Sequence, residues 1–319
     1  MELREFWILL SYLVLALRRA LTVAWIRLNK FMSPPVRSTS EFRHKVVLIG
    51  DGFAEGLGDW VVMGGRAGAA RYIECEAEAD EKVRMSWQII NRGRSGSVSA
   101  DWLPSDEKSL YHKKVCSKAC KDAEIFVVAL GTMDVVEECV GMPVAAMGKT
   151  ALDDYAEDEI CDTVKNIREI CEALRADGKR VIVCNIMTTG AGINRLTGTA
   201  KRINRQLTLY ARATATATAN GLKNAAEAAP VVLVKLNNPR STRDDGRAFD
   251  GLHLNARGYR AFGKALYEAV GPMMIAVEWK FWKSRLSGSL IEGVTSGLAG
   301  APGSNKIVEL KSVASKKAD

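Results

Sequence analysis

The sequence predicts an α/β fold in which helices cover both faces of a parallel β-sheet. Short apolar runs rich in branched residues recur between residues 45 and 236, and such runs are typical of buried parallel strands. Longer stretches with apolar residues at helical spacing lie between them. The 319 residues, 47% hydrophobic and 26% charged, can enclose such a core and exclude a disordered or collagen-like chain. In this fold class a functional site is expected at the carboxyl ends of the strands.

Residues 1–32 are predicted to form an amphipathic helix. At 100° per residue, apolar side chains gather on one face, and Thr22 and Asn29 lie on the opposite face. Arg18 and Arg19 interrupt the apolar run, which leaves it short of the about 20 residues that a membrane span needs. The apolar face comprises Leu3, Phe6, Leu10, Leu13, Val14, Leu17, Leu21, Ala24 and Leu28.

This pattern favours a helix that lies in the plane of a membrane surface. Phe6, Trp7 and Trp25 would then lie at the interface, while Arg18 and Arg19 would reach the lipid headgroups. Two alternatives stay open: a tilted span or signal anchor that starts near Phe6, and a helix packed on its own domain. The Lys and Arg residues that follow a span would keep the main domain on the cytosolic side. We therefore expect a membrane-associated protein whose main domain faces the cytosol.

A linker at residues 33–44 and a main domain at residues 45–270 are expected after this helix. The predicted strands are apolar runs such as KVVLI and RVIVC, and the predicted helices repeat apolar residues every three or four positions. The strands are expected at residues 45–49, 87–90, 125–130, 180–184 and 231–236, and the helices at residues 154–176, 200–220 and 256–269.

The end of the chain is expected to consist of two parts. Residues 271–286 contain Pro272, Trp279 and Trp282 and are predicted to form a final helix rich in Trp and Lys. This helix is either a second element at the membrane interface or one that closes the main domain. Residues 287–319 are rich in Gly, Ser, Ala and Lys, a composition that predicts a disordered tail.

Positive charge is concentrated at the two ends of the chain, whose net charge is +8. Residues 1–45 carry eight Lys and Arg against three Glu, and residues 280–319 carry seven against three acidic residues. The region between them is therefore nearly neutral, which argues against nucleic-acid binding by the folded body. Basic ends favour an anionic lipid surface as the partner. No feature of the sequence indicates an oligomeric state.

The seven cysteines are scattered along the chain and odd in number. This pattern indicates reduced core thiols in a reducing compartment rather than a disulfide framework. Cys116 and Cys120 share one face of a helix, but no second cysteine pair accompanies them, as a structural zinc site would require. We therefore expect neither a metal nor a cofactor.

Four short motifs stand at or near the ends of predicted strands. They are Gly-Asp-Gly-Phe-Ala-Glu-Gly at residues 50–56, Asn-Arg-Gly-Arg-Ser-Gly at residues 91–96, Gly-Thr-Met-Asp at residues 131–134 and Asp-Gly-Leu-His at residues 250–253. In this order and spacing they resemble the signature blocks of the SGNH (GDSL-type) hydrolases, a superfamily of esterases, lipases, thioesterases and acetylhydrolases. The resemblance covers about residues 45–270 and implies a three-layer α/β/α sandwich with a parallel, flavodoxin-like sheet.

The resemblance also implies a role for one residue in each motif. The position of the nucleophilic serine is occupied by Gly52, and the position of the asparagine that donates to the oxyanion is occupied by Met133. The backbone N–H groups of Gly52 and Gly96 correspond to the remaining oxyanion donors. Asp250 and His253 match the catalytic dyad, in which the histidine is the general base and the aspartate orients it.

Two of the four signature residues are therefore missing. Loss of a triad serine lowers turnover by about a millionfold, and a methionine thioether has no proton to donate to an oxyanion. The covalent mechanism of the family lacks its nucleophile here. The expected function is that of a catalytically impaired member, a pseudoenzyme that binds an acyl or lipid-like ligand or a partner protein.

An active ester or lipid hydrolase is the alternative function. Three routes to activity stay open: a hydroxyl from Ser95, Ser97 or Ser99, a water activated by His253, and attack by Asp51. In the family, the carboxylate at the position of Asp51 usually braces the turn. A third class of function is a scaffold whose pocket is vestigial.

Overall fold

The computed structural model describes residues 3–32, 44–59, 67–140, 160–187, 194–220, 229–236, 246–248 and 253–298. By its internal contacts the chain divides into two compact units, Met1–Ile275 and Ala276–Asp319. The first unit contains the sheet and all of the residues that are compared below with a hydrolase site.

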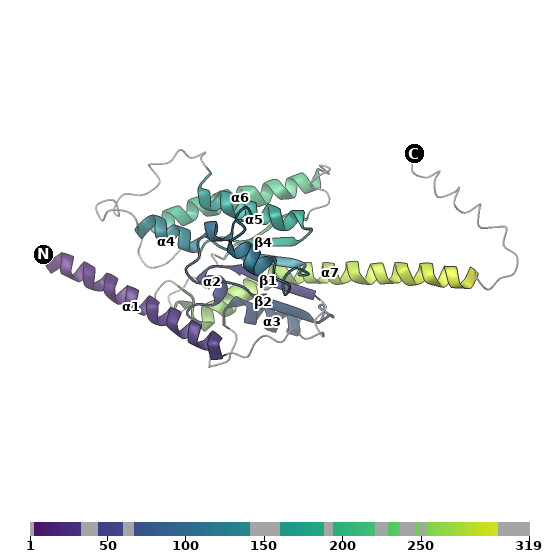
Figure 1. The fold of residues 1–319 in the computed structure, drawn as a ribbon, viewed down its shortest axis with the longest axis horizontal. Coiled ribbons are helices and arrows are strands. Elements are labelled where there is room, and N and C mark those ends of the chain that lie inside the picture. The colour runs from purple at the N-terminus through teal and green to yellow at the C-terminus, as the bar shows by residue number, and fades with distance from the viewer. Residues whose placement is uncertain are drawn as a thin grey trace. The chain divides into compact units, whose positions relative to one another are not determined.

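Five parallel strands form one sheet in the order β2-β1-β3-β4-β5 (Figure 1). This is the flavodoxin-like doubly wound order, so the predicted fold class is confirmed. All five predicted strands are present, although the last is only three residues long. The strands are β1 (His44–Gly50), β2 (Trp87–Asn91), β3 (Ile125–Ala129), β4 (Arg180–Cys184) and β5 (Val232–Val234).

Both faces of the sheet are buried, because successive strand residues point to opposite sides. In β1, Val47 and Ile49 belong to the core cluster that also contains residues of α5 (Asp162–Ala176) and α6 (Asn194–Ala219). The alternate residues Val46 and Leu48 are equally buried. The predominantly apolar strand sequences identified above therefore reflect burial on two sides.

Helices flank the sheet on each side (Figure 1). α4 (Thr132–Val140), α5 and α6 lie on one side, where the π-helical turn η2 (Tyr111–Val115) adds to the same core. α3 (Ala69–Ala79) lies on the other side and contacts β2. The first part of α7 (Ala256–Leu298) packs so closely on α3 that a Cβ on Gly263 would lie 2.4 Å from the Cβ of Tyr72.

α7 corrects the expectation for the end of the chain. One helix runs from Ala256 to Leu298, whereas the sequence predicted a helix at residues 256–269, a separate one at residues 271–286 and a disordered tail from residue 287. Pro272 lies inside the helix and removes one backbone hydrogen bond without ending it. Residues 287–298 are therefore helical, and residues 299–319 lie outside the described residues.

The predicted N-terminal helix is present as α1 (Leu3–Met32). Its buried residues are Thr22, Ile26 and Asn29, whose spacing places them on the face opposite the leucines. Leu17 and Leu21, on the apolar face, are 60% and 50% exposed. Among the described helices, none is both long and apolar enough to cross a membrane.

Candidate active site

The turn after β1 is held by Asp51. Its Oδ1 accepts a hydrogen bond from the N–H of Phe53 (3.0 Å) at the start of α2 (Gly52–Glu55). Its Oδ2 accepts one from the N–H of Thr132 (3.1 Å), which follows β3. Because β1 and β3 are neighbours at the point where the strand order reverses, this carboxylate joins the two turns at the expected position of a site.

Asp51 is 1% exposed, and burial raises its pKa to about 6. The two backbone N–H groups and the nearby charge of His253 act in the opposite direction and lower this pKa. Both carboxylate oxygens are occupied by backbone donors. This geometry fits a residue that braces the turn and gives no support to Asp51 as a nucleophile.

Gly52 faces His253 directly. A Cβ built on Gly52 would lie 2.7 Å from Nε2 of His253 and 2.6 Å from Cδ1 of Leu57. The imidazole therefore lies beside the backbone position that the resemblance assigns to the nucleophile. In place of a hydroxyl, this position presents a bare backbone whose surroundings are already filled.

His253 is itself held by its neighbours. It is 2% exposed, its ring centroid lies 5.1 Å from that of Phe53, and its carbonyl accepts a hydrogen bond from the N–H of Ala248 (2.9 Å). Asp250, the predicted partner of this histidine, lies outside the described residues. The dyad therefore stays a prediction.

The turn after β2 is clamped onto α2. The side-chain amide of Asn91 donates to the carbonyls of Ala54 (2.7 Å) and Glu55 (3.3 Å) and accepts from the N–H of Gly93 (2.9 Å). Any side chain at Gly93 would collide with α2, because a Cβ there would lie 2.3 Å from the backbone nitrogen of Glu55. The motif residues Asn91 and Gly93 thus fix how closely the two turns approach.

Gly96 lies at the tip of this turn in the left-handed region, with φ of 78°. A Cβ on it would meet no atom within 4 Å. Within the described part of the chain, neither the N–H of Gly96 nor that of Gly52 has an acceptor. The role of these two groups as oxyanion donors stays a prediction.

The hydroxyls of Ser97 and Ser99 are already engaged in the scaffold. Ser97 Oγ donates to the carbonyl of Arg94 (2.8 Å) and accepts from Nε1 of Trp102 (3.0 Å). Ser99 Oγ donates to Oδ1 of Asp134 (2.5 Å) and accepts from Nδ2 of Asn166 (3.0 Å).

Both of these serines are buried, and each would have to give up two hydrogen bonds to reach His253. Ser95, at the same turn, is partly exposed, and its N–H donates to Oε2 of Glu55 (2.6 Å). None of the three serines has a contact with His253 among the interactions of the described residues.

Met133 lies in the first turn of α4 and is buried. The next residue, Asp134, accepts from both the N–H and the hydroxyl of Ser99, and burial raises its pKa. The third motif therefore keeps the carboxylate that joins it to the second motif. The position next to it, where the family places an amide donor, carries an apolar side chain.

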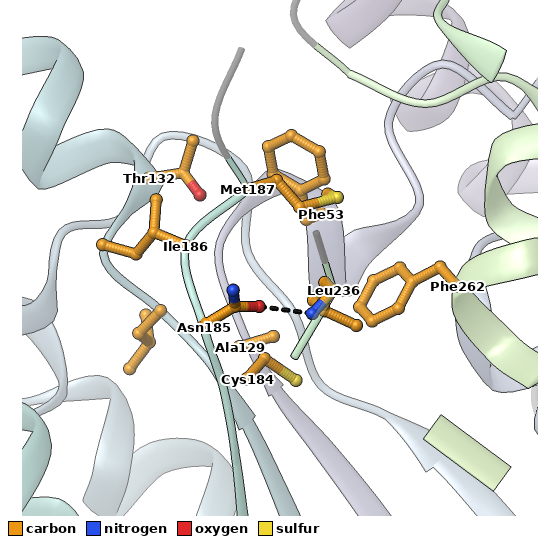
Figure 2. Close-up of a pocket in the computed structure, with 10 residues that line it drawn as sticks. Phe53, Ala129, Thr132, Cys184, Asn185, Ile186, Met187, Leu236 and Phe262 are labelled. Atoms are coloured by element: carbon orange, nitrogen blue, oxygen red, sulfur yellow. Dashed lines mark hydrogen bonds between the residues drawn. The ribbon is translucent and has the colours of Figure 1, made fainter. Parts of the chain in front are cut away.

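A small cavity lies at the carboxyl ends of β3, β4 and β5, beside Phe53 (Figure 2). Its volume is about 10 Å³, which is room for one water molecule and not for an acyl group. Oδ1 of Asn185 accepts from the N–H of Leu236 (2.5 Å), so the amide nitrogen of Asn185 points away from Leu236. Leu236, Met187 and Phe262 form apolar walls, and burial raises the pKa of the Cys184 thiol.

Sequence reasoning missed two residues that shape the turn after β1. Leu57 approaches position 52, and the hydroxyl of Tyr259 donates to the carbonyl of Leu57 (2.8 Å) and lies 3.4 Å from that of Gly52. Tyr259 falls on the first turns of α7, and its burial could have been suspected from its helical spacing with Phe262. No local pattern marks Leu57, because its position depends on how the chain turns back after α2.

The other predicted residues lie apart from this turn. On α1, Arg18 is exposed and Trp25 is partly buried, while the side chains of Phe6, Trp7 and Arg19 are outside those that the structure describes. Cys116 and Cys120 are both free thiols. Over the described ranges, no group of three or more His, Cys, Asp or Glu is placed to hold a metal ion.

The flavodoxin-like sheet and the turns that meet at its carboxyl edge define a protein of SGNH-hydrolase architecture. A model of the GDSL-like lipase/acylhydrolase family matches residues 48–261, and the chain belongs to this family. None of the curated proteins matches the chain.

Several solved structures are similar to the chain at low sequence identity. The lipase Lip_vut3 from a goat rumen metagenome is 14% identical over 71% of this chain and 97% of its own, with a TM-score of 0.46. A variant of the acetyl xylan esterase Axe2 from Geobacillus stearothermophilus is 16% identical over 72% and 95%, with a TM-score of 0.47. A GDSL-like lipase from Bacteroides thetaiotaomicron is 19% identical over 79% and 98%, with a TM-score of 0.42.

Proposed function

We propose that this protein is a catalytically impaired member of the family that acts by binding at a membrane surface. The observation that carries the first part is the surroundings of Gly52. The residue has no hydroxyl to attack an ester, and the atoms of His253 and Leu57 lie 2.7 and 2.6 Å from the position of its absent Cβ. Without a nucleophile beside the imidazole, acyl transfer through a covalent intermediate has no first step.

A water activated by His253 finds little support in the same geometry. A water oxygen at the position of the absent Cβ would lie at hydrogen-bond distance from Nε2 of His253, but it would also lie 2.6 Å from Cδ1 of Leu57, well inside van der Waals contact. The neighbouring cavity of about 10 Å³ can hold a water, but Phe53 lines it and its walls do not include His253. These contacts favour the hypothesis of a vestigial pocket over that of a working hydrolase site.

The test compares hydrolysis of short-chain and medium-chain aryl esters by the full chain and by His253→Ala. We expect no difference in rate between the two, because the imidazole has no nucleophile to activate. His112→Ala, at a partly exposed histidine on η2, is the matched control for loss of an imidazole. Activity in the parent that disappears in His253→Ala but persists in His112→Ala would establish an active hydrolase instead.

The second part of the proposal rests on the uncovered apolar face of α1. Leu13, Leu17, Leu21 and Phe31 are 66%, 60%, 50% and 88% exposed, while polar residues of the opposite face are buried. A helix that merely closed its own domain would bury the apolar face. A contiguous apolar strip of this kind is typical of a surface that meets a membrane or another protein.

The charges on α1 favour a lipid surface among these partners. At 100° per residue, the exposed Arg18 and Arg27 lie about a quarter of a turn on either side of the apolar face. In a helix lying in the interface, such arginines extend to anionic headgroups while the leucines enter the acyl region. We propose that lipid binds this face, because its exposed leucines and flanking arginines together match an anionic lipid surface.

Vesicle sedimentation tests this surface with the full chain. Vesicles of phosphatidylcholine with phosphatidylserine should bind the wild type, and Leu17→Glu/Leu21→Glu should lower binding by about tenfold or more, because two leucines no longer leave water. Leu209→Glu is the matched control, since Leu209 is an equally exposed leucine on α6. Wild-type protein that stays in the supernatant, or equal loss in the control, would contradict the membrane proposal.

A further inference from the structure

Leu57 carries an inference that deepens the proposed function and rests on it. We infer that Leu57 closes the reaction centre as a second, sterically independent block, so that a serine restored at position 52 does not regain a working position beside His253 until Leu57 is shortened. Nonbonded carbon atoms normally lie 3.5–4.0 Å apart at contact. The absent Cβ of Gly52 would lie 2.6 Å from Cδ1 of Leu57, so this contact requires a movement.

The imidazole is poorly placed to supply that movement. His253 is buried, its ring packs against Phe53 and its carbonyl is bound by the N–H of Ala248. The backbone at Gly58 also passes close to the side chain of His253, because a Cβ added to Gly58 would lie 3.3 Å from the Cβ of that histidine. The Nε2 atom must nevertheless stay within hydrogen-bond reach of any new hydroxyl in order to act as its base.

The backbone of Leu57 is equally fixed. Its N–H donates to the carbonyl of Gly52 (2.9 Å), and its carbonyl accepts from the hydroxyl of Tyr259 (2.8 Å). Only the end of its side chain can yield, and that end is enclosed, since Leu57 is 2% exposed. A bulkier residue at position 52 therefore displaces either the end of the Leu57 side chain or the imidazole of His253. Displacement of the imidazole would move the base away from the new hydroxyl.

Leu57→Ala removes the obstructing methyl groups and keeps the backbone contacts with Gly52 and Tyr259. In the double variant Gly52→Ser/Leu57→Ala, the space left by the leucine lets the new Cβ move away from Nε2 of His253, which it would otherwise approach to 2.7 Å, and the hydroxyl should then lie near Nε2. Met133 is unchanged in this variant, so the oxyanion donors remain incomplete and ester turnover is a poor readout. A covalent label whose formation depends only on the nucleophile and its base distinguishes the block at position 52 from the missing oxyanion donor.

The experiment uses an alkyl fluorophosphonate and the intact mass of the full chain. The introduced hydroxyl attacks phosphorus, a P–O bond forms, the P–F bond breaks, fluoride leaves and the hydroxyl proton passes to His253. We expect the double variant to be labelled at least tenfold faster than Gly52→Ser, and the label to be lost when His253→Ala is added. The wild type and Leu57→Ala should gain no label that depends on His253.

Gly52→Ser/Leu266→Ala is the matched control for loosening of the core, because Leu266 is a fully buried leucine of α7 that does not approach Gly52. Its labelling should equal that of Gly52→Ser. Gly52→Ser/Leu57→Val provides a milder truncation if the alanine variant does not fold, as judged by circular dichroism.

The role of Leu57 would be overturned by fast labelling of Gly52→Ser alone. It would also be overturned if neither of the two Leu57 double variants were labelled although folded. These outcomes are distinct from a failure of the proposed function, which would appear as ester hydrolysis by the wild type that depends on His253.

Discussion

Two groups of residues meet at the carboxyl edge of this sheet, and they have very different neighbours. The scaffold group, Asp51, Asn91 and Ser99, joins the turns through buried and partly buried hydrogen bonds to backbone and side chains. The reaction group, Gly52 and Met133, carries no hydroxyl or amide at the positions that the resemblance assigns to the nucleophile and to an oxyanion donor.

The difference shows that the turns do not depend on the chemistry that they support. Each scaffold residue satisfies polar groups that would otherwise be buried without a partner, so its loss would destabilise the fold. A nucleophile contributes nothing comparable to folding. Replacement of the reaction group is therefore compatible with a native sheet and native turns.

The largest expected effect on the stability of the fold comes from a substitution of Gly93, the first glycine of the second motif. Gly93→Ala would place a Cβ 2.3 Å from the backbone nitrogen of Glu55, which cannot move aside as a side chain can. We expect a loss of about 3 kcal/mol in the free energy of unfolding, measured by chemical denaturation. Gly96→Ala is the control, because only its positive φ opposes a side chain and about 1 kcal/mol is expected. Equal losses of unfolding free energy in the two variants would show that Gly93 is not tightly packed against α2.

A smaller effect is expected at Asn91. Asn91→Ala leaves the N–H of Gly93 and the carbonyl of Ala54 without their partner, at a cost of about 2 kcal/mol. Asp122→Ala provides the comparison at the surface, because Asp122 pairs with Lys45 in solvent and its loss should cost less than about 1 kcal/mol. If the two variants were equally stable, the clamp would contribute no more than a surface ion pair.

The smallest effect is the pH dependence that Asp51 brings to stability. Its pKa is about 6 in the folded protein against an ordinary value of 3.8, so the folded state holds the proton more tightly. This contribution to stability is full below pH 3.8 and is lost as the pH rises through 6. Between pH 8 and pH 5 the wild type should gain roughly 1.4 kcal/mol more than Asp51→Asn. Parallel pH profiles for the two proteins would show that Asp51 titrates normally.

The strands and the strand-end motifs could be predicted because each depends on short stretches of sequence. A strand buried on both faces is predominantly apolar, and all five predicted runs form strands. The resemblance also implied that position 52 lies beside His253, and a Cβ on Gly52 would lie 2.7 Å from Nε2 of that residue.

Other features depend on contacts between distant residues and had no local signal. The approach of Leu57 to Gly52 requires the chain to turn back at Gly56 and Gly58, both with positive φ. The continuity of α7 through Pro272 and the burial of the polar face of α1 likewise follow from the packing of whole helices. Helix periodicity identified the apolar face of α1 but not which face the protein would cover.

The carboxylate shared between Phe53 and Thr132 also affects how such sequences are recognised. Asp51 holds two turns together, and the asparagine and glycine of the second motif hold a third turn on α2. A profile that scores these positions detects the construction of the sheet edge whether or not a reactive group stands on it. A match to this signature therefore identifies the framework, and the chemistry that the framework supports has to be measured separately.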